Sequence, residues 1–248
     1  MTSLAKQLVA EFIGTFALVF VGIAATCFTG GDILSVSLAQ GLTIAALASA
    51  LMAISGAHFN PAVTLGMLVG GRIEAHRALL YMLAQLLAGF VAAGLLVYAL
   101  AGTELAPKGK PATEPVSVGM PKIPNKVINN VQSDEPRINA VQGVVIEAAL
   151  TFLLVVTYFG TMADGRGPRL GGLAVGLVAT VGVLGGGALT GGALNPARVF
   201  GPAAISGTWL NHWIYWVGPL VGGAMAGLIY GRFLLEEPEQ SVKDLGAS

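Results

Sequence analysis

Residues 55–64 read Ser-Gly-Ala-His-Phe-Asn-Pro-Ala-Val-Thr, and residues 191–200 read Gly-Gly-Ala-Leu-Asn-Pro-Ala-Arg-Val-Phe. Both stretches contain Asn-Pro-Ala, 135 residues apart, because the copies begin at residues 60 and 195. A single copy means little, since asparagine before proline is common in turns and at helix starts. Two copies, each between a run of small residues and a short apolar segment, indicate one duplicated structural device. Its core is Asn60, Pro61, Ala62, Asn195, Pro196 and Ala197.

The surrounding chain is too hydrophobic for an ordinary soluble protein. Its 248 residues are 54% hydrophobic and 10% charged, whereas charged residues make up about a quarter of a soluble domain. The apolar residues fall into runs of about 20, the length of a helix that crosses the ~30 Å hydrocarbon core of a bilayer. We predict an all-α membrane protein with six transmembrane helices at residues 8–28, 33–54, 78–100, 140–162, 170–189 and 212–234.

Several classes of function are disfavoured by the composition. The formal net charge is zero, so nothing suggests a nucleic-acid partner. Cys27 is the only cysteine, which excludes an intrachain disulfide and a thiolate metal cluster. The three histidines follow no metal-binding pattern, and there is no phosphate-binding glycine loop or nucleophile signature. We therefore expect no cofactor, no metal and no catalytic site.

The two halves of the chain match beyond the repeated motif. The matching pairs are Glu11 with Glu147, Thr15 with Thr151, Tyr81 with Tyr215, and Gly89 with Gly223. Each half holds three predicted spans, and because three is odd the halves cross the membrane in opposite directions. Such inverted repeats place functional sites near the bilayer midplane. We divide the single transmembrane domain, 1–248, into a first repeat (1–100), a connector (101–139), a second repeat (140–235) and a tail (236–248).

Each Asn-Pro opens an apolar segment of about ten residues, 62–70 and 197–205, which as helix spans ~15 Å, half a bilayer core. Asparagine favours the N-cap and proline the first helical position. Because the repeats are inverted, two half-length helices enter from opposite faces and meet at their amino ends. Each end carries about half a positive charge from aligned peptide dipoles. Together these ends disfavour cations, including hydrated protons.

The segments before the two motifs, 55–59 and 190–194, are predicted to be non-helical. Irregular backbone at this depth is tolerated only where it is buried or lines a water-filled cavity. We expect backbone carbonyls here to face a polar passage, with the Asn60 and Asn195 amides as donors at its centre. The pore-lining backbone is assigned to Gly56, Ala57, His58, Phe59, Gly191, Ala193 and Leu194.

Three charged residues lie deep within the apolar segments, away from their ends. Arg198 follows the second motif where the first has Val63, and a charge at such depth is usually functional. We interpret it as a fixed cation at a constriction, with a structural ion pair as the alternative. Glu11 and Glu147 occupy equivalent positions and are predicted to accept hydrogen bonds from the non-helical segments, since buried carboxylates need such partners. The alternative for these two is a proton relay.

The connector is rich in proline and lysine, which is typical of an extramembranous segment. The alternative is a cover over one mouth of the passage. Basic residues in short loops and tails favour one side, so both termini are predicted to be cytoplasmic.

At these residues the chain resembles the aquaporin, or major intrinsic protein, family along nearly its whole length. Residues 55–64 and 192–202 are similar to that family's two signatures. The resemblance implies six helices, two half-helices, and a homotetramer in the plasma membrane with one pore per protomer. It also implies passive passage of water through the lipid bilayer, with exclusion of protons and ions.

The family's selectivity filter corresponds to Gln40, Val183, Gly192 and Arg198. Val183 and Gly192 are smaller than the residues typical of water or glycerol channels, so the resemblance implies a wider, less polar constriction. Val199, where glycerol facilitators have aspartate, favours the water branch. We expect a water channel that also passes small neutral solutes such as glycerol. The alternatives are a glycerol facilitator and a secondary active transporter, which needs titratable residues along its path.

Overall fold

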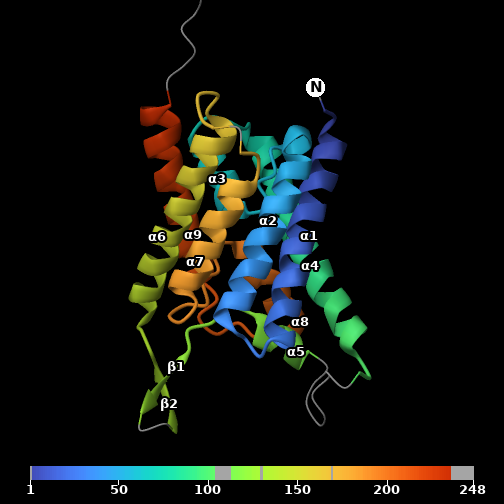
Figure 1. The fold of residues 1–248 in the computed structure, drawn as a ribbon, viewed down its shortest axis with the longest axis vertical. Helices are drawn as coiled ribbons and strands as arrows, with labels where there is room; N and C mark the ends of the chain where they lie inside the picture. Colours follow the sequence, from blue (N-terminus) through green and yellow to red (C-terminus); the bar gives the residue numbers. More distant parts are fainter. Residues whose placement is uncertain (1, 104–112, 129–130, 169, 236–248) are drawn as a thin grey trace, which may run out of the picture.

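Each of the six predicted spans forms a helix in the computed structural model, which describes residues 2–103, 113–128, 131–168 and 170–235 (Figure 1). The helices are α1 (Leu4–Phe28), α2 (Ile33–Ser55), α4 (Ala75–Leu100), α6 (Ala140–Tyr158), α7 (Leu173–Gly186) and α9 (Ile214–Leu228). α6 and α9 continue as π-helical turns, η1 (Phe159–Ala163) and η2 (Ile229–Leu234). The predicted all-α fold is confirmed. Within the part of the chain that the structure describes, five helices are long and apolar enough to cross a membrane, while α7 has 14 residues.

α7 is shorter than the predicted run 170–189 because glycines lie at both of its ends. Gly171 has a φ of 57° in the turn before the helix, and Gly191 has a φ of 82° five residues after the last helical residue, Gly186. Glycine reaches this left-handed region at no steric cost. The chain therefore leaves the helical path at both ends, although the run of apolar residues continues beyond them.

Polar side chains fix where several helices begin. The Asp32 carboxylate accepts from the amide of Ser35 at 2.8 Å, at the start of α2. Asn139 and Gln142 form a reciprocal capping box at the start of α6. These side chains satisfy amide groups that have no partner within the helix.

Two short helices fill the space between the long ones. α3 (Pro61–Val69) lies in the half of the bundle that holds the N-terminus, and α8 (Pro196–Ser206) lies in the other half (Figure 1). Both begin at the proline of the repeated motif, one residue before the predicted starts, because proline itself takes the first helical position. We call the end of the bundle with Leu4 and Leu234 the terminal end, and the opposite one the connector end.

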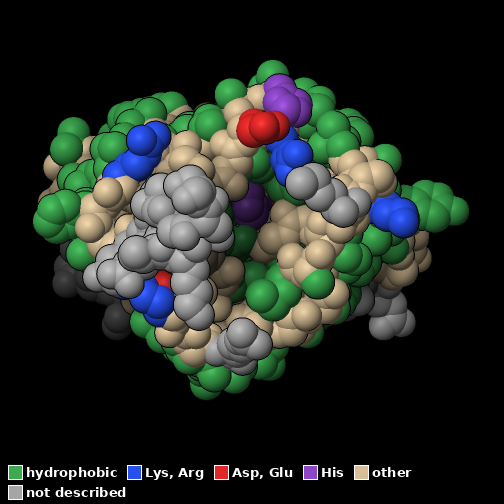
Figure 2. Space-filling model, turned by 90° about the horizontal axis from the view of Figure 1, so that it is seen from above, with side chains coloured by type: hydrophobic (Ala, Val, Ile, Leu, Met, Phe, Trp, Pro, Cys, Tyr) green, Lys and Arg blue, Asp and Glu red, His purple; other side chains and the backbone are tan. Residues whose placement is uncertain are grey.

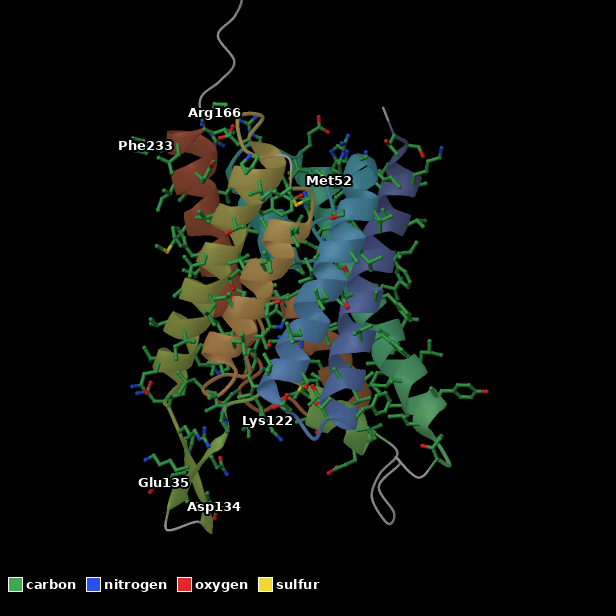
Figure 3. All side chains as sticks on the ribbon, in the orientation of Figure 1. Met52, Lys122, Asp134, Glu135, Arg166 and Phe233 are labelled. Atoms are coloured by element: carbon green, nitrogen blue, oxygen red, sulfur yellow. The ribbon has the colours of Figure 1, made fainter. Side chains whose placement is uncertain are left out.

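The connector holds structure that its composition did not predict. It contains helix α5 (Glu114–Gly119) and the antiparallel strands β1 (Asn125–Ile128) and β2 (Val131–Pro136). The hairpin extends beyond the connector end, where Asp134 and Glu135 are labelled (Figure 3). Arg137 anchors its base, since Nη1 donates to the Ala188 carbonyl at 3.1 Å. This bond ties the hairpin to the loop that follows α7.

Glycines bring the half-helices close to the long helices. A Cβ added to Gly223 would lie 2.3 Å from the Ala62 carbonyl oxygen, and one on Gly227 would lie 2.2 Å from that of Gly66. Gly223 and Gly227 of α9 therefore pack against α3 within the protomer. On the opposite side, a Cβ on Gly201 of α8 would lie 2.1 Å from the Gly89 carbonyl oxygen of α4. Small residues permit this close approach of helix backbones.

Large apolar side chains cover the outside of the bundle. Leu79, Leu83 and Leu87 lie four residues apart on α4 and are 59%, 53% and 57% exposed. Val141 and Val145 of α6 are 69% and 61% exposed. In a soluble protein such surfaces are rare, whereas a bilayer solvates them. The chain is a multi-pass membrane protein.

Candidate functional site

The two asparagines of the repeated motif hold the half-helices together. Each side chain caps its own helix, with Asn60 Oδ1 2.8 Å from the Ala62 amide and Asn195 Oδ1 3.0 Å from that of Ala197. Each side-chain amide also crosses to the other repeat. Asn60 Nδ2 donates to the Leu194 carbonyl at 2.8 Å, and Asn195 Nδ2 donates to the Phe59 carbonyl at 2.9 Å.

This reciprocal pairing places the amino ends of α3 and α8 side by side inside the bundle. It also changes the expected role of the asparagines. One hydrogen of each Nδ2 joins the two loops, so one hydrogen remains on each for anything that passes. Among the described residues it has no other acceptor.

The loop before α3 is wrapped around the carboxylate of Glu11, which is fully buried. Oε1 accepts from the Ser55 hydroxyl at 2.6 Å and the His58 amide at 2.9 Å. Oε2 accepts from the Phe59 amide at 2.7 Å and from Gln85 Nε2 at 2.8 Å. Four donors thus converge on one side chain and turn the loop carbonyls away from it.

The loop before α8 repeats this arrangement around Glu147. Oε1 accepts from the Thr190 hydroxyl at 2.6 Å and from the Ala193 amide at 2.9 Å, and Oε2 accepts from the Leu194 amide at 2.8 Å. The corresponding distances differ by at most 0.1 Å between the repeats. Tyr215 completes the match, because its hydroxyl donates to the Thr190 carbonyl at 2.8 Å.

Several residues of this framework were not among the predicted site residues: Ser55, Thr64, Tyr81, Gln85, Thr190 and Tyr215. Ser55 and Thr190 occupy equivalent places just before each motif, as do Tyr81 and Tyr215 along the repeats. The repeat alignment therefore contained a signal for both pairs. Gln85 and Thr64 have no polar counterpart in the second repeat, so the repeat alignment contained no signal for them.

The loops hold ordinary residues in the left-handed region of backbone space. The φ angles are 58° at Ala57, 52° at Phe59 and 54° at Leu194. Such conformations cost about 1–3 kcal/mol and persist only where the surroundings impose them. Here the carboxylates of Glu11 and Glu147 accept from the amides of Phe59 and Leu194, and the Ser55 hydroxyl oxygen accepts from the amide of Ala57.

A narrow cavity runs past the paired asparagines. The volume open to the centres of water molecules is about 30 Å³. This is enough for a few waters in a row, because one water needs about 10–15 Å³ by this measure. Figure 2 shows a hollow at the middle of the terminal face. One wall of the cavity is polar loop and the other is apolar. The lining residues are Leu18, Gln40, Ile44, Ala57, His58, Phe59, Asn60, Val63, Leu154, Val175, Ala179, Val183, Ala193, Leu194, Asn195 and Arg198.

Arg198 is 6% exposed and borders this cavity. Its Nη1 donates to the carbonyls of Gly192 and Ala193, the latter at 3.3 Å. None of the ion pairs found among the described residues includes Arg198. The arginine is thus held by loop carbonyls rather than by a paired carboxylate. Guanidinium hydrogens remain for the lumen, since the group carries five.

The other three expected filter residues, Gln40, Val183 and Gly192, differ in whether they line the narrow cavity. Gln40 is 2% exposed and lines the cavity, and its Nε2 has no hydrogen-bond partner among the described residues. Val183 lies on the same cavity. Gly192 does not, and a Cβ there would lie 2.9 Å from the Cα of Val183. A side chain at Gly192 would therefore press on α7. The effect of Gly192 on the width of the passage stays a prediction.

Two more expected lining residues lie elsewhere. The Gly56 carbonyl accepts from the Tyr158 hydroxyl, and Gly56 is not among the residues lining the cavity. Gly191 lines a second cavity, at the connector end. The volume open to the centres of water molecules in this outer cavity is about 240 Å³. This outer cavity shares Val183 and Arg198 with the narrow one.

Part of the connector forms the wall of the outer cavity. Met120, Pro121, Lys122 and Pro124 line it, and Lys122 lies at the connector end of the bundle (Figure 3). Pro121 packs on Gly191, whose added Cβ would lie 2.8 Å from the Pro121 Cα. Of the two alternatives for the connector, this geometry favours a partial cover over one mouth.

Comparison with known proteins shows which family has this fold. A profile described as "Major intrinsic protein" matches residues 1–230. "Aquaporin TIP4-4" of Zea mays is 39% identical over 244 residues, covering 93% of this chain and 88% of that protein. "Aquaporin TIP4-1" of Arabidopsis thaliana is 39% identical over 249 residues, covering 96% and 90%. The aquaglyceroporin structure from Plasmodium falciparum has a TM-score of 0.75 at 24% identity and covers 94% of this chain and 97% of that one.

The inverted repeats, the paired half-helices and the cavity between them define a membrane channel protein. The chain belongs to the major intrinsic protein family.

Proposed function

We propose that the chain is a passive channel through which water crosses a membrane along the narrow cavity. The observation that carries this proposal is the reciprocal pairing of Asn60 and Asn195 beside that cavity. Loop carbonyls supply acceptors along one wall and the two amides supply donors at the centre. Water then exchanges hydrogen bonds with the protein as it moves, so its desolvation is offset along the path.

Ions and protons are excluded by fixed positive charge. The amino ends of α3 and α8 meet beside the lumen, and each carries about half an elementary charge. Arg198 adds a full charge at the boundary with the outer cavity. Cations meet this field where little water screens it. Anions lose their hydration shell in a passage that has an apolar wall.

Small neutral solutes such as glycerol are proposed as additional substrates. Arg198 and Gln40 offer donors to a hydroxyl oxygen, while Val183 offers an apolar surface to carbon atoms. A glycerol facilitator is the second candidate, favoured by this mixture of donors and apolar wall. A coupled transporter is less well supported, because no carboxylate is among the residues lining the narrow cavity.

Stopped-flow light scattering on liposomes that hold the full chain tests the water channel. We expect shrinkage several times faster than in empty liposomes. Val183→Trp fills the narrow cavity and should return the rate to that of empty liposomes. Val181→Trp is the matched control, because Val181 lies on the same helix but is 62% exposed on its outer face. Equal rates for wild type and empty liposomes refute the proposal, and faster glycerol than water flux favours the facilitator.

The assembly and location are proposed from the family resemblance. We propose a homotetramer in the plasma membrane, with one pore per protomer and both termini in the cytoplasm. The N-terminus and the end of η2 lie at the same end of the bundle (Figure 1), as an even number of spans requires. Protease access to tags at either terminus in sealed cells tests the orientation.

A further inference from the structure

A chain of hydrogen bonds runs from the carboxylate of Glu11 to the imidazole of His58. Gln85 Nε2 lies 2.8 Å from Glu11 Oε2 and 3.0 Å from Thr64 Oγ1. Thr64 Oγ1 lies 3.1 Å from His58 Nδ1. Glu11, Gln85 and Thr64 are fully buried, and His58 is 7% exposed. The bonds therefore form away from bulk water.

The direction of each bond follows from what the groups can donate. A carboxylate oxygen faces Gln85, so the NH₂ end of that amide is turned toward it, and its second hydrogen goes to Thr64. Thr64 then accepts from Gln85 and must place its own hydroxyl hydrogen elsewhere. Among the described residues, His58 Nδ1 is the remaining partner of that hydroxyl. A buried donor left unpaired is destabilising, so the hydroxyl hydrogen goes to that nitrogen.

His58 Nδ1 is therefore an acceptor, and a neutral imidazole then carries its hydrogen on Nε2. The ring orientation is fixed as well. Tyr81 and Tyr158 pack edge-on against it, with ring centroids 5.2 Å and 5.6 Å away. His58 lines the narrow cavity, and Nε2 has no hydrogen-bond partner among the described residues.

We propose that Gln85 and Thr64 are positioning residues that lock His58 in the Nε2–H tautomer, so that His58 is a fixed donor to water in the narrow cavity. The role in water passage rests on the proposed channel function, whereas the tautomer lock does not. The lock also stops His58 from relaying protons. A relay needs one ring nitrogen to take a proton while the other releases one, and the Thr64 hydrogen occupies Nδ1.

The second repeat lacks the hydrogen-bonded chain of Gln85, Thr64 and His58. Residues equivalent to His58, Thr64 and Gln85 are Ala193, Val199 and Pro219, none of which has a polar side chain. That repeat instead supplies Arg198, where the first has Val63. The first repeat thus contributes a neutral imidazole to the cavity lining, and the second repeat contributes a guanidinium.

Solid-state NMR of the full chain in liposomes, with ¹⁵N-labelled histidine, tests the lock. His58 signals are assigned from their absence in His58→Gln. We expect a protonated Nε2 and an unprotonated Nδ1 in the wild type. Thr64→Val keeps the side-chain shape and installs the residue found at position 199, and it should give a mixture of tautomers. Thr64→Ser restores the hydroxyl and should restore the single tautomer.

Water permeability per protein is measured on the same samples. Losing one net hydrogen bond to water predicts about a two- to tenfold fall for Thr64→Val, with recovery in Thr64→Ser. Thr43→Val is the matched control, because that hydroxyl bonds within its own helix, to the Ala39 carbonyl. A wild-type Nδ1–H tautomer or an unchanged Thr64→Val spectrum overturns the lock. An altered tautomer with unchanged permeability overturns the donor role, and wild type without any water flux refutes the channel while the spectra still decide the lock.

Discussion

At the residue scale, Glu11 and Glu147 replace the hydrogen bonding of a helix or sheet. Each carboxylate accepts from backbone amides of a non-helical loop, which have no partner in regular secondary structure. Each carboxylate binds two consecutive amides and the hydroxyl of the residue three positions before the first of them. The left-handed angles at Phe59 and Leu194 are stable only with these bonds in place. The supporting role proposed for the two acids agrees with this geometry, and neither of them lines the cavity.

Glu11→Gln tests that role. The substitution replaces one acceptor oxygen by an NH₂ group that faces donors, so at least one buried amide or hydroxyl loses its partner. We expect a loss of stability of about 1–3 kcal/mol and reduced water flux, measured by thermal unfolding in detergent and by stopped flow. Glu74→Gln is the control, because Glu74 is an exposed acid near His76. A Glu11→Gln channel with wild-type stability and flux contradicts the supporting role.

Arg198→Val tests the fixed charge by giving the second motif the residue of the first. The change removes the cation and leaves the Gly192 and Ala193 carbonyls without this donor. We expect measurable proton or monovalent-cation leak in liposomes that hold a pH-sensitive dye, because one barrier is lost. Arg198→Lys keeps the charge and should leak less. A leak-free Arg198→Val channel with intact water flux would show that the helix ends suffice.

At the element scale, the half-helices depend on close packing against the long helices. Gly227 of α9 faces the Gly66 carbonyl of α3, where an added Cβ would lie at 2.2 Å. Gly227→Ala therefore forces the two helices apart, at a cost of about 1–3 kcal/mol. Gly185→Ala is the control, because an added Cβ there has no atom within 4 Å. Thermal unfolding should separate the two variants, and equal midpoints would contradict the packing.

The turn after η1 carries a pH-dependent contribution. The Arg166 side chain and amide bind the Asp164 carboxylate and lower its pKa from 3.8 to about 2. A depressed pKa adds stability above the ordinary value, and that stability is lost as the pH falls toward 2. The gap in unfolding midpoint between wild type and Asp164→Asn should be full above about pH 4 and shrink toward pH 2. A gap that stays constant over this range contradicts the assignment.

Local pattern predicted the elements better than it predicted their contacts. The runs of apolar residues gave six helices, and Asn-Pro gave the starts of α3 and α8 to within one residue. Equivalence of Glu11 and Glu147 pointed to their shared geometry. The bonds from Gln85 to Thr64 and from Asn60 to the Leu194 carbonyl join residues 21 and 134 positions apart. No periodicity encodes such contacts, because they exist only once the helices have packed.

At the scale of the whole molecule, the inverted repeats bring the positive amino ends of two helices together at the centre of the channel. Two amino ends that would repel each other are held together by the crossed bonds of Asn60 and Asn195. The resulting positive centre lies beside a narrow cavity with one polar and one apolar wall. Symmetry positions this centre, and the departures from symmetry at Arg198 and His58 distinguish its two halves.

Electron cryomicroscopy of the full chain in lipid nanodiscs, at a resolution that shows ordered water, tests this account most directly. We predict water density along the cavity, with one water within hydrogen-bond distance of both the Asn60 and Asn195 amides. The amides should also reach the opposite loop carbonyls. Asparagines that lie apart, or a passage beside them that is closed and dry, would contradict the account.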